Sequence, residues 1–329
     1  MPFLVDSIRI ALNRLGVSPH LMLNAPLKII RDKKNEVTEL APIVDNKITA
    51  TSEETVFLIE IDRQATQDEL DAIKNTLLSV VKDIHLTVSD WQPMLACLNA
   101  VIEEVKQAKY PGSKKEKDDT LRFLSWVAAN NFTLMGYRSY DLNAVKGDIS
   151  LDADLKSSLG LMKNSQGLKR LLVSNLSESG RKIALGKSHL VLTKTNSHSR
   201  VHRPAQLDYI GVKRFDEQGN VIGESRFIGL FGAAFYTSSV LDLPFINVKV
   251  KAVCDASLFA KGTHNYKTLI NILETYPRDE VLQSTVEELL HNVTGILQMQ
   301  ERDYTGLFVR RDAFDRFYSC MVYVPRERY

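Results

Sequence analysis

The chain has 329 residues, of which 44% are hydrophobic and 25% are charged, and its formal net charge is +2. These values are ordinary for a globular protein, and the length predicts two or three domains. The small charge and the absence of a polybasic tract argue against nucleic acid and against a membrane surface as partners.

The three cysteines, Cys97, Cys254 and Cys320, are far apart and form no CxxC pair. An odd number of scattered thiols argues against a disulfide framework and against a structural zinc site, and it favours a cytoplasmic protein. No stretch predicts a transmembrane segment, because charged residues interrupt even the apolar opening of the chain.

The first third of the sequence predicts helix, strands, helix. Residues 3–15 show helical spacing of apolar positions, and short strand-like runs follow at 20–23, 27–31, 37–40 and 56–61. Thr66 and Glu69 have the spacing of a capping box and so predict a helix start. Pro93 marks a break, and helical spacing resumes over 94–105. This order is most of a ferredoxin-like α+β unit that lacks its first strand.

The middle of the chain predicts a second α+β domain built on an antiparallel sheet. Residues 110–119 are expected to be a linker, followed by a helix over 120–130 and a strand over 133–141. The polar stretch 143–188 predicts loops and short helices. Strands are expected at 189–195, 209–215 and 221–231, and Gly219 supplies the positive φ that a hairpin turn between the last two can require.

The last part predicts one long helix and an incomplete sheet. Thr275 is expected to cap a helix over 275–300 whose first turn contains Pro277. Residues 307–309 and 317–324 then predict a hairpin that is apolar on both faces and therefore needs covering. The arginines around it alternate with acidic residues, which predicts local compensation of charge and suits a domain contact; these are Arg310, Arg311, Arg316, Arg326 and Arg328, with Asp312, Asp315 and Glu327.

No catalytic motif accompanies these elements. GxGxxG, GxxxxGK[ST], HExxH and GxSxG are all absent. His198 and His202 are four residues apart, but two nitrogens on a segment that is not helical make a poor metal site, so no metal ligand is expected. Trp91 and Trp126 are interpreted as core anchors.

One segment could bind an anion. If residues 194–203 form an extended strand, its two-residue period places a row of polar and cationic side chains on one face. Such a row could hold a carboxylate or phosphate by charge-assisted hydrogen bonds. The plainer alternative is a polar strand edge or loop whose charges are solvated by water or pair with Asp208 or Asp216. The candidate effector-binding residues are Lys194, Asn196, His198, Arg200, His202 and Arg203.

Several blocks of the sequence resemble a known family. These blocks are "MPFLVDSIRIALNRLG", "DWQPM", "LTKTNSHSRVHRPAQLDYIGVKRFD", "RFIGLF", "NILETYPRDEVLQ" and "LFVRRDAFDRFYSCMVYVPRERY". Together they resemble the N-terminal region of the large bacterial NAD-specific glutamate dehydrogenases, over essentially the whole chain.

The resemblance implies a domain order. Residues 1–109 would be an ACT-like domain without its first strand, residues 110–300 a PAS-like domain with its connecting helix 275–300, and residues 301–329 the first hairpin of a second ACT-like domain. The covering helix of that hairpin would then lie outside this sequence. The family's catalytic lysine and nucleotide-binding fold have no counterpart here, so no catalytic, cofactor or metal residue is carried over.

The resemblance also implies a role. The chain would be a non-catalytic regulatory or oligomerisation segment, inactive alone. The parent enzyme would use NAD to oxidise L-glutamate in amino-acid catabolism, with its catalytic domain in the same polypeptide. A homo-oligomer and an amino-acid effector are the expected partners. Two alternatives stay open: a free-standing small-molecule sensor, and a small hydrolase that works through His198 or His202.

Overall fold

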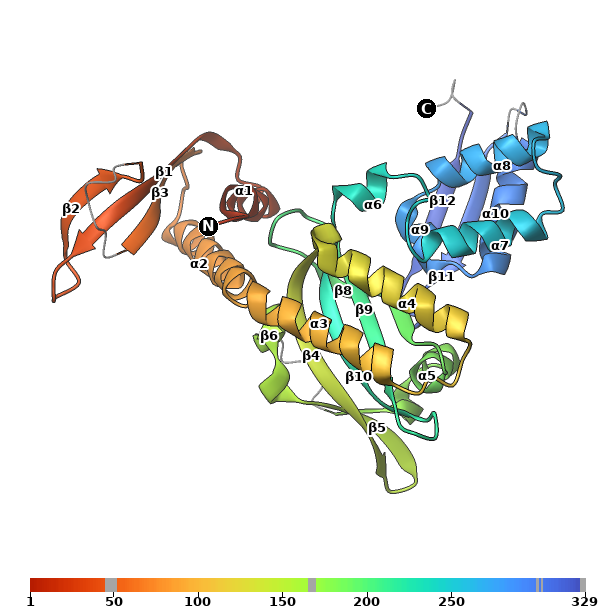
Figure 1. Ribbon diagram of the computed structural model, residues 1–329. Coiled ribbons are helices and arrows are strands. Elements are labelled where there is room, and N and C mark those ends of the chain that lie inside the picture. Colours follow the sequence, from red (N-terminus) through yellow and green to blue (C-terminus); the bar gives the residue numbers. More distant parts are fainter. Residues whose placement is uncertain (45–51, 165–169, 300–301, 303, 326–329) are drawn as a thin grey trace. The chain divides into compact units, whose positions relative to one another are not determined.

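The computed structural model describes residues 1–44, 52–164, 170–299, 302 and 304–325 (Figure 1). The chain divides into two compact units. The first unit comprises residues 1–88 together with 199–204, and the second comprises residues 89–198 together with 205–329. Each unit is described by itself below.

The first unit begins with helix α1 (Leu4–Arg14), as the apolar spacing predicts. A three-stranded antiparallel sheet follows among the described residues, in the order β2 (Val37–Pro42), β1 (Pro19–Arg31), β3 (Ser52–Ile61). The two runs predicted at 20–23 and 27–31 form the single strand β1. Pro26 is tolerated inside it because β2 pairs with β1 only from Leu27 onward, so no ladder bond to β2 is lost.

Helix α2 (Gln67–Ser89) completes the first unit, and its predicted start is confirmed. The Thr66 amide donates to Glu69 Oε2 at 2.9 Å, and the Glu69 amide donates to Thr66 Oγ1 at 3.3 Å. Helix α3 (Trp91–Gln107) begins after Asp90 and packs in the second unit. The boundary between the two compact units therefore lies before α3, at residues 88 and 89, whereas the domain boundary expected from the sequence lies after α3, at residues 109 and 110.

In the second unit, the predicted linker at 110–119 is wrong from Lys114 onward. Helix α4 (Lys114–Trp126) begins there, and a short π-helical turn, η1 (Val127–Asn131), follows it. Ser113 and Glu116 form a reciprocal capping box: the Ser113 amide donates to Glu116 Oε2 at 2.9 Å and the Glu116 amide to Ser113 Oγ at 3.2 Å. The charged run is therefore the solvated first turn of a helix.

Helices α3 and α4 lie against one face of a curled antiparallel sheet, as Figure 1 shows. Within the described ranges it has seven strands in the order β7, β5, β4, β10, β9, β8, with β6 paired to β4. The strands are β4 (Phe132–Val145), β5 (Asp148–Ala153), β6 (Leu159–Gly160), β7 (Arg170–Leu172), β8 (Leu190–His198), β9 (Gln206–Phe215) and β10 (Val221–Phe231).

Strand β10 has its predicted limits, and Gly219 in the turn before it has φ of +80°. The stretch 143–188 is more ordered than its polar sequence indicates. It contains β5, β6 and β7, helix α5 (Glu178–Leu185) and three short 3₁₀ turns, η2 (Leu155–Ser157), η3 (Leu161–Lys163) and η4 (Val173–Asn175).

The single helix predicted over 275–300 is wrong. Thr275 ends helix α8 (His264–Thr275) instead of starting a helix, and Pro277 precedes the short helix α9 (Arg278–Gln283). Helix α10 (Val286–Met299) then starts at a capping box in which the Thr285 amide donates to Glu288 Oε2 at 2.8 Å. Helices α6 (Ala233–Thr237) and α7 (Ile246–Ala256) lie earlier in a stretch for which the sequence analysis predicts no element.

The predicted C-terminal hairpin is present as β11 (Gly306–Arg311) and β12 (Tyr318–Tyr323). One face shows half-exposed or exposed Leu307, Val309 and Val322, so this face lacks a cover within the described residues. Arg326, Glu327 and Arg328 lie outside the described residues.

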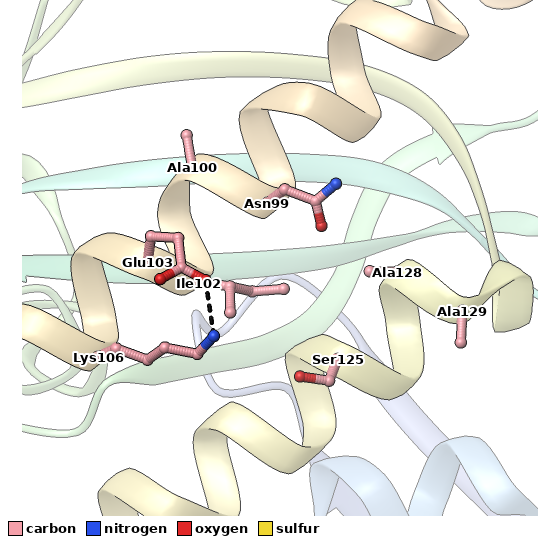
Figure 2. Close-up of a pocket in the computed structure, with 8 residues that line it drawn as sticks. All are labelled: Asn99, Ala100, Ile102, Glu103, Lys106, Ser125, Ala128 and Ala129. Carbon is pink, nitrogen blue, oxygen red and sulfur yellow. Dashed lines mark hydrogen bonds and ion pairs between the residues drawn. The ribbon is translucent and has the colours of Figure 1, made fainter.

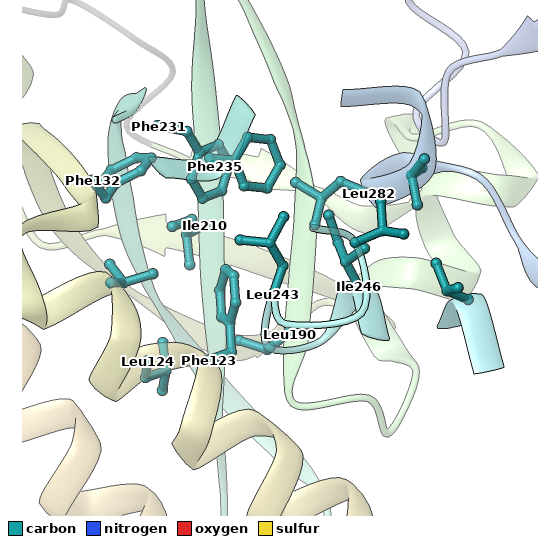
Figure 3. Packing of buried hydrophobic residues seen from close by; sticks show 14 of the residues in the cluster. Phe123, Leu124, Phe132, Leu190, Ile210, Phe231, Phe235, Leu243, Ile246 and Leu282 are labelled. Atoms are coloured by element: carbon teal, nitrogen blue, oxygen red, sulfur yellow. The ribbon is translucent and has the colours of Figure 1, made fainter. Parts of the chain in front are cut away.

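The core of the second unit lies between the sheet and its helices and is rich in aromatic rings (Figure 3). Phe231 and Phe235 stack with ring centroids 4.1 Å apart, and Trp126 packs beside them. Trp91 is 39% exposed, so its interpretation as a core anchor is wrong. Among the described residues, no helix has the length and apolar character needed to span a membrane.

Candidate functional site

The six candidate anion-binding residues do not share one strand face. Strand β8 ends at His198, and residues 199–204 leave it to pack in the first unit. Lys194 is buried, while Asn196 and His198 are exposed near the end of the strand. The expectation of a continuous extended segment over 194–203 is therefore wrong, and anion binding by any of these residues stays a prediction.

Lys194 is held by carboxylates of its own unit. Its Nζ lies 2.5 Å from Asp208 Oδ1 on β9 and 3.1 Å from Asp279 Oδ1 on α9. Burial opposes the charged form of Lys194, but the two carboxylates outweigh it and raise the pKa of the lysine. Burial also raises the pKa of Asp208 to about 6, against the lowering effect of Lys194. The plainer alternative, pairing with Asp208, is the one that the structure contains.

Residues 199–204 bind both helices of the first unit. Arg200 pairs with Asp83 on α2 and donates to Ser79 Oγ at 3.1 Å. The His202 amide donates to Ser7 Oγ on α1 at 3.0 Å, and the Arg14 guanidinium donates to the Ser199 carbonyl at 2.8 Å. The Arg200 side chain and the backbone amide of His202 therefore hold a segment that contacts both α1 and α2.

The two histidines show no catalytic setting. The His202 ring contacts Phe3 with centroids 5.0 Å apart, its Nδ1 is buried without a hydrogen-bond partner, and burial lowers its pKa. His198 is exposed at the end of β8. Within the described residues no group of three or more His, Cys, Asp or Glu side chains could hold a metal ion.

A polar row on the sheet was missed by the sequence analysis. The Arg226 guanidinium on β10 lies 4.0 Å from the Tyr140 ring centroid and 4.8 Å from that of Tyr209, and the Tyr209 hydroxyl donates to Glu224. Lys213 on β9 is also buried and donates to the Gly186 carbonyl at 2.5 Å; burial lowers its pKa to about 8. The signal was the polar period of two in otherwise apolar strands, seen at Glu224 and Arg226.

An open groove of about 580 Å³ lies between α3 and α4 (Figure 2). Glu103 and Lys106 pair across one turn of α3 at 2.6 Å. The Ser125 hydroxyl shares no hydrogen bond with Glu103 or Lys106 in the described structure. The other lining residues are small, neutral or apolar: Asn99, Ala100, Ile102, Ala128 and Ala129.

His189 is a buried histidine of the second unit that packs between aromatic rings. It is 2% exposed, stacks on Tyr110 with centroids 3.9 Å apart, and meets the edge of Phe215. Neither ring nitrogen has a hydrogen-bond partner in the described structure. Burial lowers its pKa to about 4, so the ring is neutral near pH 7.

Three arginines of the hairpin form ion pairs with carboxylates, two of them with the nearby aspartates that the sequence indicates. Arg316 pairs with Asp312 at 2.7 Å and Arg311 with Asp315 at 2.8 Å. Arg310 instead reaches Glu280 on α9, with Nε 2.7 Å from Oε2.

Comparison with known proteins gives three family matches. Residues 1–77 match the glutamate dehydrogenase ACT1 domain, residues 243–302 match glutamate dehydrogenase helical motif 1, and residues 306–329 match the glutamate dehydrogenase ACT2 domain. The first match agrees with an ACT-like domain at the start of the chain.

Similar curated proteins carry the same designation. The NAD-specific glutamate dehydrogenase of Halomonas elongata is 38% identical over 99% of this chain, and that of Pseudomonas aeruginosa is 36% identical over all of it. The protein of that name from Mycobacterium tuberculosis is 24% identical over 99%. The alignments cover 20%, 20% and 19% of those proteins, so the chain spans about a fifth of the length of the curated relatives it matches.

Proposed function

Because the chain belongs to the NAD-specific glutamate dehydrogenase family, we propose that it is a non-catalytic regulatory and assembly segment of such an enzyme. The observation that carries this proposal is the whole-length similarity to proteins about five times longer, in which this chain matches ACT and helical segments. The parent enzyme would oxidise L-glutamate to 2-oxoglutarate and ammonia with NAD, and its catalytic domain would lie elsewhere in the same polypeptide.

Our domain assignment follows the same reasoning. Residues 1–109 form an ACT-like domain that lacks its first strand, and residues 110–300 form a PAS-like domain. The curled antiparallel sheet of β4 to β10 supports the second assignment, and α3, which precedes residue 110, packs on the same sheet. Residues 301–329 open a second ACT-like domain, which agrees with the uncovered apolar face of β11 and β12.

Two regulatory roles are open to such a segment, an amino-acid sensor and an oligomerisation scaffold. Thermal melting against aspartate, arginine, glutamate and nucleotides tests the sensor. A ligand at a hundred times its dissociation constant adds roughly 2.7 kcal/mol. For a domain of this size that raises the melting midpoint by several degrees. A flat response to all of these compounds would contradict the sensor role.

Light scattering of the purified chain tests the scaffold. The first unit supports this role, because its sheet exposes apolar side chains: Leu23 is 52% exposed and Leu58 is 62% exposed on paired positions of β1 and β3. A mass of two or more chains is expected at micromolar concentration. A monomer at all concentrations would contradict assembly through this segment.

A further inference from the structure

Helix α9 has only six residues, yet its first three are all charged and each binds a different element of the second unit. Arg278 donates to the Leu273 carbonyl at the end of α8 at 3.2 Å and to the Ser238 carbonyl at 3.1 Å. Asp279 pairs with Lys194 on the edge strand β8 at 3.1 Å. The helix is therefore fastened to the helical layer and to the sheet at once.

The third residue, Glu280, binds the C-terminal hairpin. Its two oxygens accept from Arg310 on β11, at 2.7 Å from Nε and 3.0 Å from Nη2. Ser319 on β12 donates to Glu280 Oε1 at 2.8 Å. One carboxylate thus holds both strands of the hairpin.

The turn of the hairpin binds the same edge strand directly. Thr193 Oγ1 donates to Asp312 Oδ1 at 2.9 Å. Arg316 Nη2 donates to the Lys194 carbonyl at 2.6 Å and to Thr193 Oγ1 at 2.9 Å. Lys194 is therefore bound twice, through its side chain by α9 and through its backbone by the hairpin.

These polar contacts are buried, whereas the outer face of the hairpin is open. Lys194, Arg310 and Asp312 are exposed by 8%, 5% and 2%. Removing one partner of a buried charge pair leaves an uncompensated charge, which is far more costly than losing a solvated pair. The other anchorage of the hairpin is apolar: Phe308, Met321 and Tyr323 pack against the core of the second unit, and Gly295 on α10 leaves room for the Phe308 ring.

We propose that α9 is a coupling element, which holds the hairpin 306–323 in register with edge strand β8 through Asp279 on one side and Glu280 on the other. A change in the conformation of β8 then changes the order of the hairpin, and the reverse holds because coupling is reciprocal. This proposal deepens the proposed function, since it names the route by which the curled sheet would communicate with the segment matched to ACT2.

Hydrogen exchange of the full chain, measured by mass spectrometry, tests the coupling. For each variant, the amide exchange rate is measured in the element that the substituted residue does not contact. Asp279→Asn does not touch the hairpin, yet it is expected to speed amide exchange over 306–311 and 318–323 by roughly fivefold or more. Glu280→Gln does not touch β8, yet it is expected to speed exchange over 190–195. The double variant should show less than the product of the two single effects, because either change already breaks the connection that runs through α9, while the direct bonds of Asp312 and Arg316 to β8 remain in all variants.

The matched control is Asp152→Asn. This removes the exposed pair between Asp152 and Arg170 on β5 and β7 of the same unit, at 2.7 Å, and should leave both segments at wild-type exchange. If Asp279→Asn speeds exchange only in α9 and β8 while the hairpin stays at its wild-type rate, the coupling is refuted. That outcome leaves the proposed regulatory function untouched, because the experiment involves neither effector nor dehydrogenase activity.

Discussion

The three-stranded sheet of the first unit and the seven-stranded sheet of the second differ in how many of their described residues are buried. Among the described residues of the three-stranded sheet in the first unit, only Ile29 and Ala41 are buried, and several leucines and valines are exposed. The sheet of the second unit contributes Tyr137, Ile210 and Phe227 to a continuous core beneath helices. The seven-stranded sheet is thus buried largely by its own unit, whereas the three-stranded sheet leaves apolar side chains exposed, which fits the proposed role in assembly.

The largest expected difference between the two regions comes from core truncation. Phe231→Ala in the second unit removes a ring packed on Phe132 and Phe235 and should lower the free energy of unfolding by about 3–5 kcal/mol. Leu58→Ala in the first sheet, where the side chain is 62% exposed, should change it by less than about 0.5 kcal/mol. Urea unfolding followed by tryptophan fluorescence reports the second unit, which contains both tryptophans. For Leu58→Ala, the rate of amide exchange in the first sheet measures the loss of stability. Equal losses in the two variants would contradict the expected difference between the two units.

The second largest difference is expected in the stability that is lost when an ion pair is broken in each unit. Lys194→Met leaves Asp208 and Asp279 without their cation in a buried site, which should cost about 3 kcal/mol or more. Glu54→Gln breaks the pair with Arg31 at 2.9 Å in the first sheet and should have a much smaller effect than Lys194→Met, because solvent screens this pair. Urea midpoints at pH 7 measure the first variant, and exchange of β1 and β3 measures the second. A loss below about 1 kcal/mol for Lys194→Met would show that the cluster is solvated.

Acidification should act on the second unit through His189. Its pKa in the folded chain is about 4, below the value of 6.5 for an unperturbed histidine. The unfolded chain therefore binds the proton first, so this group's stabilising effect is complete above pH 6.5 and is lost as the pH falls toward 4. The loss reaches up to about 3 kcal/mol, and unfolding measured between pH 7 and 4.5 should show it.

His189→Phe keeps an aromatic ring between Tyr110 and Phe215 and should flatten this pH dependence. The matched control is His20→Gln in the first unit. His20 is exposed and its pKa is raised by the hydrogen bond to Asp62, so it cannot destabilise the fold on acidification. An unchanged slope in His189→Phe would assign the acid sensitivity to other groups.

The smallest difference between the two units is expected for the removal of a helix cap, which should lower the stability of each unit by about the same amount. Ser113→Ala and Thr66→Ala each remove one side of a capping box, at the start of α4 and α2 respectively. Each should lower stability by about 1 kcal/mol. Exchange of the first helical turns gives the comparison, and a loss confined to one unit would show that the caps differ in burial or strain.

The sequence predicts those elements whose signals are local. The apolar period of α1, the capping box of α2 and the strand β10 could all be located from neighbouring residues. Two errors came from local signals that were present but not used. Ser113 with Glu116, and Thr285 with Glu288, have capping-box spacing at the true starts of α4 and α10.

Other features could not be predicted because they depend on distant parts of the chain. The pairing of Lys194 with Asp208 joins neighbouring strands and was weighed from the sequence as an alternative. The contribution of Asp279 depends on α9 being a separate helix packed at the sheet edge. Arg200 and His202 leave the strand because Ser79, Asp83 and Ser7 bind them, and no local pattern marks those partners.

The central claim, that this chain regulates or assembles a dehydrogenase without catalysing its reaction, is tested most directly by an assay. Purified chain is incubated with L-glutamate and NAD, and the formation of NADH is followed by absorbance. The account predicts a rate equal to the background without protein. Glutamate-dependent NADH formation by the chain alone, at a rate proportional to its concentration, would contradict it.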